Sequence, residues 1–287
     1  MQSAIHVQNL TLRIGHETIL QDINLQVPAG AVVGLVGRNG AGKSSLLRCL
    51  VGLEDPSSGG STLLGCPSLH LTDTVRERLG YVAQTPDVFE WMEVMEMIKV
   101  IGSAYPQWNE TRALALAVQL NLPVGRRISE LSGGDQQKLS VVLAMAHNPE
   151  LLLLDEPVSS LDPMTRREFM RALFTSPLLS DTASDAAGGA ERPRTVLISS
   201  HLLTDLERVV THVAFVREGR LQLFDAWDAM LEHLRLVPLA AVNGRTEGVV
   251  CRNPLAHTAV IDTRVLMGHA TSGRAMGLDE LFLELNT

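Results

Sequence analysis

Eight consecutive residues near the start of the chain have the side chains and the backbone freedom that phosphate binding requires. They match the pattern GxxxxGK[ST], and they lie between an apolar run at 31–36 and a segment at 45–51 with apolar residues on one helical side. Glycines let backbone N–H groups converge on phosphate oxygens, and the N-terminus of a following helix adds positive potential. Four fixed positions in this context favour a phosphate site over a plain glycine-rich turn. We therefore predict that a nucleotide is bound by these eight residues, Gly37, Arg38, Asn39, Gly40, Ala41, Gly42, Lys43 and Ser44, and by the adjacent Ser45.

Two of these residues, together with two acids later in the chain, have the side chains for phosphoryl chemistry. Lys43 would place a positive charge on the β and γ phosphates, and the Ser44 hydroxyl would ligate the Mg²⁺ ion that bridges them. A second apolar run, 151–154, ends in Asp155 and Glu156, and acids at the carboxyl end of a parallel strand point into the ligand crevice. We expect Asp155 to hold Mg²⁺ through water and Glu156 to polarise the attacking water. Alone, the two acids fit a solvated strand end equally well, and the phosphate loop favours chemistry.

Hydrophobic periodicity predicts the elements that position these residues. Apolar and polar residues alternate over 5–12 and 19–27, which predicts an antiparallel sheet with one solvated face. The runs at 31–36, 151–154 and 196–198 are continuously apolar, as buried parallel strands are. Between the first two of these runs, residues from about 87 to 146 have helical spacing. The simplest fold is therefore α/β, with a helical subdomain inserted into the sheet.

The C-terminal part of the chain has a different pattern. A stretch at about 175–194 is rich in small and polar residues, which predicts a flexible surface loop. After Leu223 we expect a helix through Trp227 and Leu234, short strands around Ala240 and Ala259, and a final helix at 278–285. The predicted organisation is a main domain at 1–225 and a small C-terminal extension at 226–287.

Composition excludes several classes of protein. Apolar residues make up 45% of the chain and charged residues 20%, which predicts a globular protein rather than a disordered or collagen-like one. The formal charge of −8 disfavours unspecific binding to nucleic acid. Three cysteines in no CxxC pair indicate neither disulfides nor a zinc site, so a reducing cytoplasm is expected. We find no signal peptide and no apolar run near the roughly 18 residues that a membrane span needs.

A third motif, LSGGDQQ at 131–137, lies between the phosphate loop and the LLLLDEP strand. These motifs, in this order, resemble the nucleotide-binding subunits of ABC transporters, and the resemblance covers residues 5 to about 223. It implies a P-loop NTPase (RecA-like) core with an antiparallel β subdomain and an inserted α-helical signature subdomain. It also implies that ATP is hydrolysed with Mg²⁺ at two sites shared across a head-to-tail dimer with a second copy or a close paralogue.

The resemblance also implies roles for individual residues. Gln84 is similar to the glutamine that contacts magnesium and the attacking water and couples the site to the membrane partner. His201 resembles the histidine that contacts the γ phosphate. Ser132, Gly133 and Gly134 would bind the γ phosphate of the nucleotide on the opposite subunit. Asp162 would communicate across the dimer, and the alternatives are that it caps the helix at 165–174 or does both.

The sequence departs from the family pattern at two positions. The family usually has an aromatic residue where this chain has Ile14, so stacking on the base would be lost unless His16 substitutes, and we expect weak discrimination between ATP and GTP. The second position is in the motif at 131–137, which corresponds to the signature motif of the family: Asp135 stands where the commonest form of that motif has Gln. Its carboxylate would either repel phosphate slightly or cap its own helix, and both alternatives stay open.

The predicted function is an ATPase subunit that drives a separate transmembrane permease from the cytoplasmic face of the cell membrane. The segment YPQW at 105–108 with Asn109, and the tail at 281–285, resemble bacterial ABC-2-type exporter subunits. The alternatives are an importer subunit, a soluble ABC-type ATPase acting on ribosomes or nucleic acid, and a nucleotide switch with negligible turnover. Most apolar residues after Gln84 would be core, with Trp91 and Met92 at the surface to receive a coupling helix of the permease.

Overall fold

The computed structural model describes residues 3–159, 161–175, 194–201, 206–242, 244–265 and 273–286. Residues 176–193 lie outside these ranges, so the loop expected at about 175–194 stays a prediction. Strands and helices are interspersed along the described chain, and most strands of the central sheet pair in parallel, which confirms the α/β class. Within the described ranges, every helix is too short or too polar to span a bilayer.

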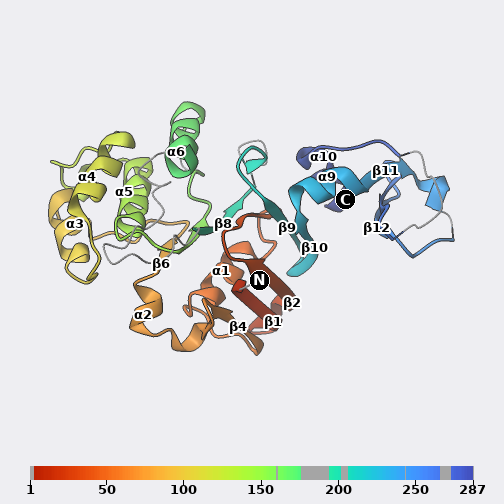
Figure 1. Ribbon diagram of the computed structural model, residues 1–287, viewed down its shortest axis with the longest axis horizontal. Coiled ribbons are helices and arrows are strands. Elements are labelled where there is room, and N and C mark those ends of the chain that lie inside the picture. The colour runs from red at the N-terminus through yellow and green to blue at the C-terminus, as the bar shows by residue number, and fades with distance from the viewer. Residues whose placement is uncertain are drawn as a thin grey trace, which may run out of the picture.

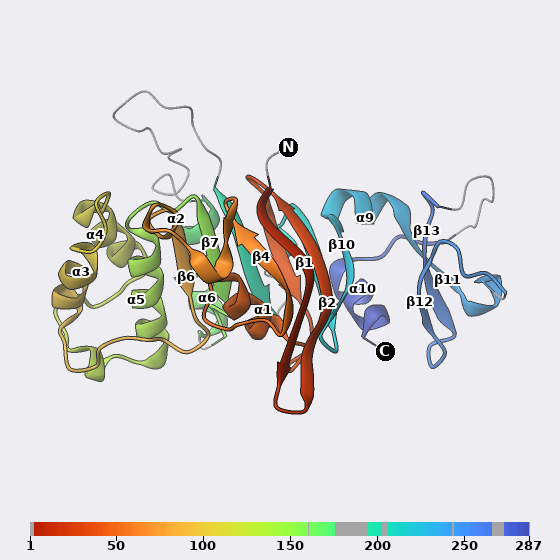
Figure 2. The same ribbon diagram turned by 90° about the horizontal axis from the view of Figure 1, so that it is seen from below.

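An antiparallel sheet contains the N-terminal strands, as the alternating pattern predicts. Its order is β2-β1-β4-β5, with bounds β1 (Ser3–Ile14), β2 (Glu17–Pro28), β4 (Ser58–Leu63) and β5 (Cys66–Pro67). β1 and β2 form a long hairpin in which Val7 lies opposite Leu25, and the hairpin extends beyond its neighbours in Figure 2. Most apolar side chains of the hairpin are buried, so one face of this sheet is core.

The central sheet brings the three predicted parallel strands together. Its order is β10-β9-β3-β8-β7-β6, with bounds β10 (Arg220–Ala226), β9 (His212–Arg217), β3 (Val32–Val36), β8 (Thr195–Ser200), β7 (Leu151–Asp155) and β6 (Leu79–Val82). All neighbours pair in parallel except β10, which is antiparallel to β9. Val36 lies opposite Ser200, and Asp155 lies opposite Ser199. The carboxyl ends of β3, β8 and β7 therefore meet at one edge of the sheet.

Among the described residues before the C-terminal extension, the helices form two groups, three that lie next to single strands in the chain and three that lie together between β6 and β7. α1 (Lys43–Leu50) follows β3, α2 (Asp73–Arg76) precedes β6, and α6 (Pro163–Thr175) follows β7. Between β6 and β7 the chain forms α3 (Val94–Gly102), α4 (Glu110–Gln119) and α5 (Gly133–Met145). Figures 1 and 2 both show these three helices together at one end of the molecule, which confirms the inserted helical subdomain.

Two apolar cores lie on opposite faces of the central sheet, because successive side chains of a strand point to opposite faces. Leu151 and Leu153 belong to the core that includes the β1–β2 hairpin and α1. Leu152 and Leu154 belong to the core that includes α3, α4 and α5. β7 is thus buried on both sides, as its continuous apolar run predicts.

The C-terminal extension has a three-stranded sheet of its own, in the order β11-β13-β12. Its elements are α9 (Trp227–His233), β11 (Leu234–Pro238), β12 (Val249–Asn253), β13 (Thr258–Asp262) and α10 (Leu278–Leu285). The final helix and the strand near Ala259 are confirmed, whereas the helix expected through Trp227 and Leu234 ends at His233, because Leu234 begins β11. The strand expected around Ala240 is wrong, because the pairing of β11 with β13 ends at Pro238 and the next residues, Leu239–Val242, form a 3₁₀-helix.

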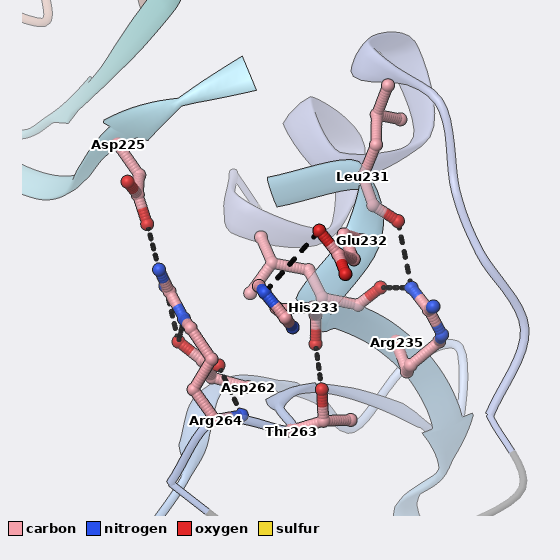
Figure 3. A network of polar contacts seen from close by, with 9 residues as sticks. Asp225, Leu231, Glu232, His233, Arg235, Asp262, Thr263 and Arg264 are labelled. Carbon is pink, nitrogen blue, oxygen red and sulfur yellow. Dashed lines mark hydrogen bonds and ion pairs between the residues drawn. The ribbon is translucent and has the colours of Figure 1, made fainter. Parts of the chain in front are cut away.

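A charged network joins this extension to the central sheet, as Figure 3 shows. Arg264, just after β13, contacts Asp225 of β10 at 2.6 Å and Asp262 at 2.7 Å. Hydrogen bonds to Asp262 and Asp225 raise the pKa of Arg264 above its usual value. The guanidinium therefore acts as a permanently charged link between β10 and β13.

We expect Arg264→Met to speed amide hydrogen exchange in β13 without unfolding the central sheet. The cost in local unfolding free energy is about 1 kcal/mol or less, because the network is partly exposed to solvent. The matched control is Arg235→Met, since the Arg235 guanidinium binds the backbone oxygens of Leu231 and Leu234 within its own segment. Unchanged protection of β13 in the Arg264 variant would contradict this role.

Candidate active site

The phosphate loop turns between β3 and α1 and requires glycine at two positions. A Cβ at residue 37 would lie 2.4 Å from the carbonyl oxygen of Val216. At residue 42, where φ is 99°, a Cβ would lie 2.7 Å from Leu20 Cδ2. Gly37 and Gly42 therefore let the loop backbone pack directly on β9 and β2. Along the loop, Arg38, Asn39 and Gly40 are exposed, Ala41, Gly42 and Lys43 are buried, and Ser44 and Ser45 are half-buried.

Lys43 connects the loop to the acidic end of β7. Its ammonium donates to the carbonyl oxygens of Gly37 at 2.8 Å and Arg38 at 3.3 Å, and lies 3.4 Å from Glu156 Oε1. The other carboxylate oxygen of Glu156 lies 2.6 Å from His201 Nδ1. Glu156 is only 5% exposed, and its φ of 47° is in the left-handed region that non-glycine residues rarely adopt. The surroundings thus hold a buried carboxylate between a cation and a histidine.

Asp155 is held by two hydroxyl groups. The Ser44 hydroxyl donates to Asp155 Oδ1 at 3.0 Å, and the Ser199 hydroxyl donates to the same oxygen at 2.7 Å. Ser199 Oγ also accepts the backbone N–H of Glu156 at 2.8 Å, so one serine orients both acids. Sequence reasoning missed Ser199. The available signal was its position in the 195–200 strand, but the pairing with Asp155 depends on the order and register of the strands.

The donor set around Asp155 fits a magnesium ion. Ser44, Asp155 and Gln84 line one cavity of about 560 Å³, which is bounded by α1, β6, α3 and α5, and Gln84 is exposed. A hydroxyl, one carboxylate and an amide provide oxygen ligands, and Mg²⁺ typically binds through one or two carboxylates with water and substrate phosphates. Among the described residues, His, Cys, Asp and Glu form no cluster of three that would suit another metal.

The signature residues lie on a different element from the phosphate loop. Ser132 caps α5, where its Oγ accepts the N–H of Asp135 at 3.1 Å. Gly133 is exposed and Gly134 is half-buried at the start of this helix, in the helical subdomain, whereas the phosphate loop precedes α1 (Figure 1). Within one chain, the residues at the start of α5 and the phosphate loop therefore do not form one site. A role for Ser132, Gly133 and Gly134 therefore requires a second subunit, and it stays a prediction.

Gln137 is a second residue that sequence reasoning did not assign to the site. Its side chain is 1% exposed on α5, and its Nε2 donates to the carbonyl oxygen of Ala83 at 3.2 Å. Ala83 follows the last residue of β6 and directly precedes Gln84. The signature helix thus contacts the segment that carries Gln84.

Asp162 caps α6 in the structure. Its Oδ1 accepts the N–H groups of Met164 at 3.0 Å and Thr165 at 3.1 Å. The hydrogen bonds from Thr165, together with that from Met164, lower the pKa of the exposed Asp162 carboxyl. Capping, one of the two predicted roles, is therefore observed, while communication across a dimer stays a prediction.

The predicted surface position of Met92 is wrong. Trp91 is 69% exposed and stacks on Phe89 with ring centroids 5.9 Å apart, but Met92 is only 7% exposed. The backbone turns inward here because Met92 N donates to Phe89 O, and Met92 O accepts from Ile128 N. The exposed ring pair is thus Phe89 and Trp91.

Ile14 is 53% exposed at the tip of the β1–β2 hairpin, before Gly15. An aliphatic side chain lacks the aromatic stacking that contributes about 1 to 3 kcal/mol to base binding. We expect ATP and GTP affinities to differ by much less than tenfold, and Ile14→Tyr to tighten both by about fivefold. Fluorescent-nucleotide displacement measures this, with Ile14→Leu as the control that adds no ring. Strict preference for ATP in the parent chain would contradict the prediction.

A phosphate loop beside a strand that ends in two buried acids defines a P-loop NTPase. Comparison with known proteins gives a narrower class, since residues 20–159 match the family described as ABC transporter. The bacitracin transport ATP-binding protein BcrA of Bacillus licheniformis is 30% identical over 225 residues, covering 77% of this chain and 69% of the relative. The phosphonates import ATP-binding protein PhnC 1 of Ruegeria sp. (strain TM1040) is 32% identical over 245 residues, covering 79% of this chain and 90% of the relative.

A solved structure agrees with these matches. An ATP-binding subunit of an ABC transporter superimposes with a TM-score of 0.67 at 25% identity, covering 80% of this chain and 92% of that one. The chain belongs to the ABC transporter family as an ATP-binding subunit. It is an ATP hydrolase with the P-loop fold that its motifs predict.

Proposed function

We propose that this chain hydrolyses ATP to drive export through a separate transmembrane permease, from the cytoplasmic face of the membrane. The observation that carries the proposal is the place of the exporter-like segment at 105–109. Tyr105 stacks on His147 with ring centroids 4.3 Å apart, and both line the cavity that also contains Gln84. Tyr105 of this segment thus lines the same cavity as Gln84, the residue expected to couple hydrolysis to the permease. Import is the second candidate, because PhnC 1 is named as an import protein.

The contacts of the site suggest how it hydrolyses ATP. Lys43 and the loop N–H groups would bind the β and γ phosphates, and Ser44, Asp155 and Gln84 would hold Mg²⁺, which supplies charge neutralisation on the phosphates. Glu156 would accept the proton of the attacking water. His201 contacts Glu156 directly and would orient this base and contact the γ phosphate.

A second ATPase subunit, a further copy or a close paralogue, would complete each site. Its Ser132, Gly133 and Gly134 would bind the γ phosphate, because N–H groups at a helix start favour anions. Asp162 would lie near the contact between subunits. Residues 1–225 would form this ATPase unit, and 226–287 the extension. The net charge of −8 gives no support for nucleic acid as a partner.

The permease would dock near Phe89 and Trp91. These two rings are exposed and stacked, and they follow Gln84 in the chain. Aromatic groups of this kind suit an apolar helix from a partner. A coupling helix seated there could transmit motion to Gln84 through the intervening residues.

The first test is a pull-down of tagged chain carrying Glu156→Gln from membranes in mild detergent with Mg-ATP. A stoichiometric partner with several spans of about 20 apolar residues would support the permease. Recovery of ribosomal proteins or nucleic acid without a membrane protein would instead favour the soluble ATPase.

Direction is tested by reconstituting the chain and its partner in proteoliposomes with ATP outside. Under export, compounds from a cell extract should accumulate inside the vesicles, and the Trp91→Ala variant should transport less while its ATP hydrolysis in detergent is unchanged. Loss of compounds loaded inside the vesicles would establish import and contradict the proposal.

A further inference from the structure

Ser132, Asp135 and Lys138 form a polar cluster in the first turns of α5. The Ser132 hydroxyl lies 2.8 Å from Asp135 Oδ2 and donates to it, while Ser132 Oγ accepts the N–H of Asp135 at 3.1 Å. The other carboxylate oxygen of Asp135 accepts from Lys138 Nζ at 2.8 Å. Asp135 therefore holds the serine side chain at two points and is itself held by a lysine.

The Ser132 hydroxyl has a single proton to donate. While that proton is directed to Asp135, it is not directed to any other acceptor. A phosphate oxygen that approaches the start of α5 must compete with Asp135 for the proton. An uncharged side chain at position 135 would compete less, because hydrogen bonds to ionised groups are stronger than neutral ones.

The cluster keeps Asp135 ionised. Partial burial alone would raise its pKa, but hydrogen bonds from Lys138 and Ser132 and the charges of Lys138 and Arg126 outweigh burial, so the pKa of Asp135 lies below its usual value. Lys138 is only 9% exposed, and its ammonium lies 2.8 Å from the Asp135 carboxylate. A negative charge thus lies beside the hydroxyl that would meet the γ phosphate.

We propose that Asp135 is a positioning residue that acts through Ser132: it retains the serine proton within α5 and so raises the ATP concentration needed to close the dimer. Lys138 moderates this effect by neutralising the carboxylate. The inference rests on the proposed function, because it needs Ser132 to bind a nucleotide held by a second subunit. With Asp135 in place of the usual Gln, the shared site would close only at high ATP concentration.

The test measures ATP-dependent dimer formation rather than turnover. All variants carry Glu156→Gln, and the ATP concentration for half-maximal dimer is read by size-exclusion chromatography with light scattering. Asp135→Ala should lower this concentration by about fivefold, because it removes the competing acceptor. Lys138→Met should raise it by a similar factor, because the carboxylate loses its counter-charge.

Ser132→Ala is the control that separates an effect of Asp135 through Ser132 from a purely structural effect of Asp135. In this background Asp135 has no serine proton to retain, so Asp135→Ala should shift the half-maximal ATP concentration by less than about twofold. Far-UV circular dichroism and melting temperature verify that each variant is folded.

Two results would overturn the inference. The first is an unchanged or higher ATP requirement in Asp135→Ala while the parent still dimerises, and the second is an equal shift with and without Ser132. If the parent binds fluorescent ATP but dimerises at no ATP concentration, the proposed shared site fails, and the inference fails with it.

Discussion

Glu156→Gln is expected to slow ATP turnover by about two to four orders of magnitude while ATP still binds, because an amide cannot accept the proton of the attacking water. The substitution preserves size and places an amide where the carboxylate contacts His201 at 2.6 Å and Lys43 at 3.4 Å. It also removes the negative charge of Glu156, which competes with the phosphates for the Lys43 ammonium. ATP affinity should therefore be unchanged or higher, and the loss should appear in kcat.

Glu150→Gln is the matched control for this prediction. Glu150 precedes the same strand at its other end, where it pairs with Arg78 at 2.7 Å. The same chemical change there should leave kcat within about twofold, since the pair is partly exposed and far along β7 from the phosphate loop. Steady-state phosphate release and fluorescent-nucleotide binding measure both variants. Unchanged hydrolysis in Glu156→Gln would exclude the residue as the base.

Features that depend on neighbours in the sequence could be predicted. The phosphate loop, the apolar run of β7 and the acids at its end are each contiguous, and their residue types follow from local chemistry and periodicity. The buried strands at 151–154 and 196–198 were predicted correctly, because a central parallel strand is covered on both faces and is therefore continuously apolar. The same reasoning places Asp155 at a strand end without saying which strand lies beside it.

Features that depend on packing could not be predicted. Ser199 reaches Asp155 only because β8 lies between β3 and β7 in register. Gln137 reaches Ala83 across the contact between α5 and β6. Met92 was expected at the surface on its residue type, but the backbone bond from Ile128 draws it into the core. Each of these contacts joins segments that are distant in the sequence, where periodicity carries no information.

Lys43→Met is expected to have two separable effects. It should weaken ATP binding by about two orders of magnitude or more, because the β and γ phosphates lose their direct positive charge. It should also destabilise the folded chain by about 3 kcal/mol, because Glu156 would then be buried without its cation. Both residues are almost fully buried, so water cannot replace the lost contact.

Combining Lys43→Met with Glu156→Gln separates the two effects. The double variant has no unpaired buried carboxylate, so its stability to chemical denaturation should return most of the way to that of the parent. ATP binding should stay lost, because neutralising Glu156 provides no new charge for the phosphates. Urea unfolding and nucleotide binding by isothermal titration calorimetry measure the two properties on the same samples. If stability is not recovered, the 3.4 Å contact between Lys43 and Glu156 does not stabilise the fold, and if ATP binding is recovered, Lys43 is not the phosphate-binding charge.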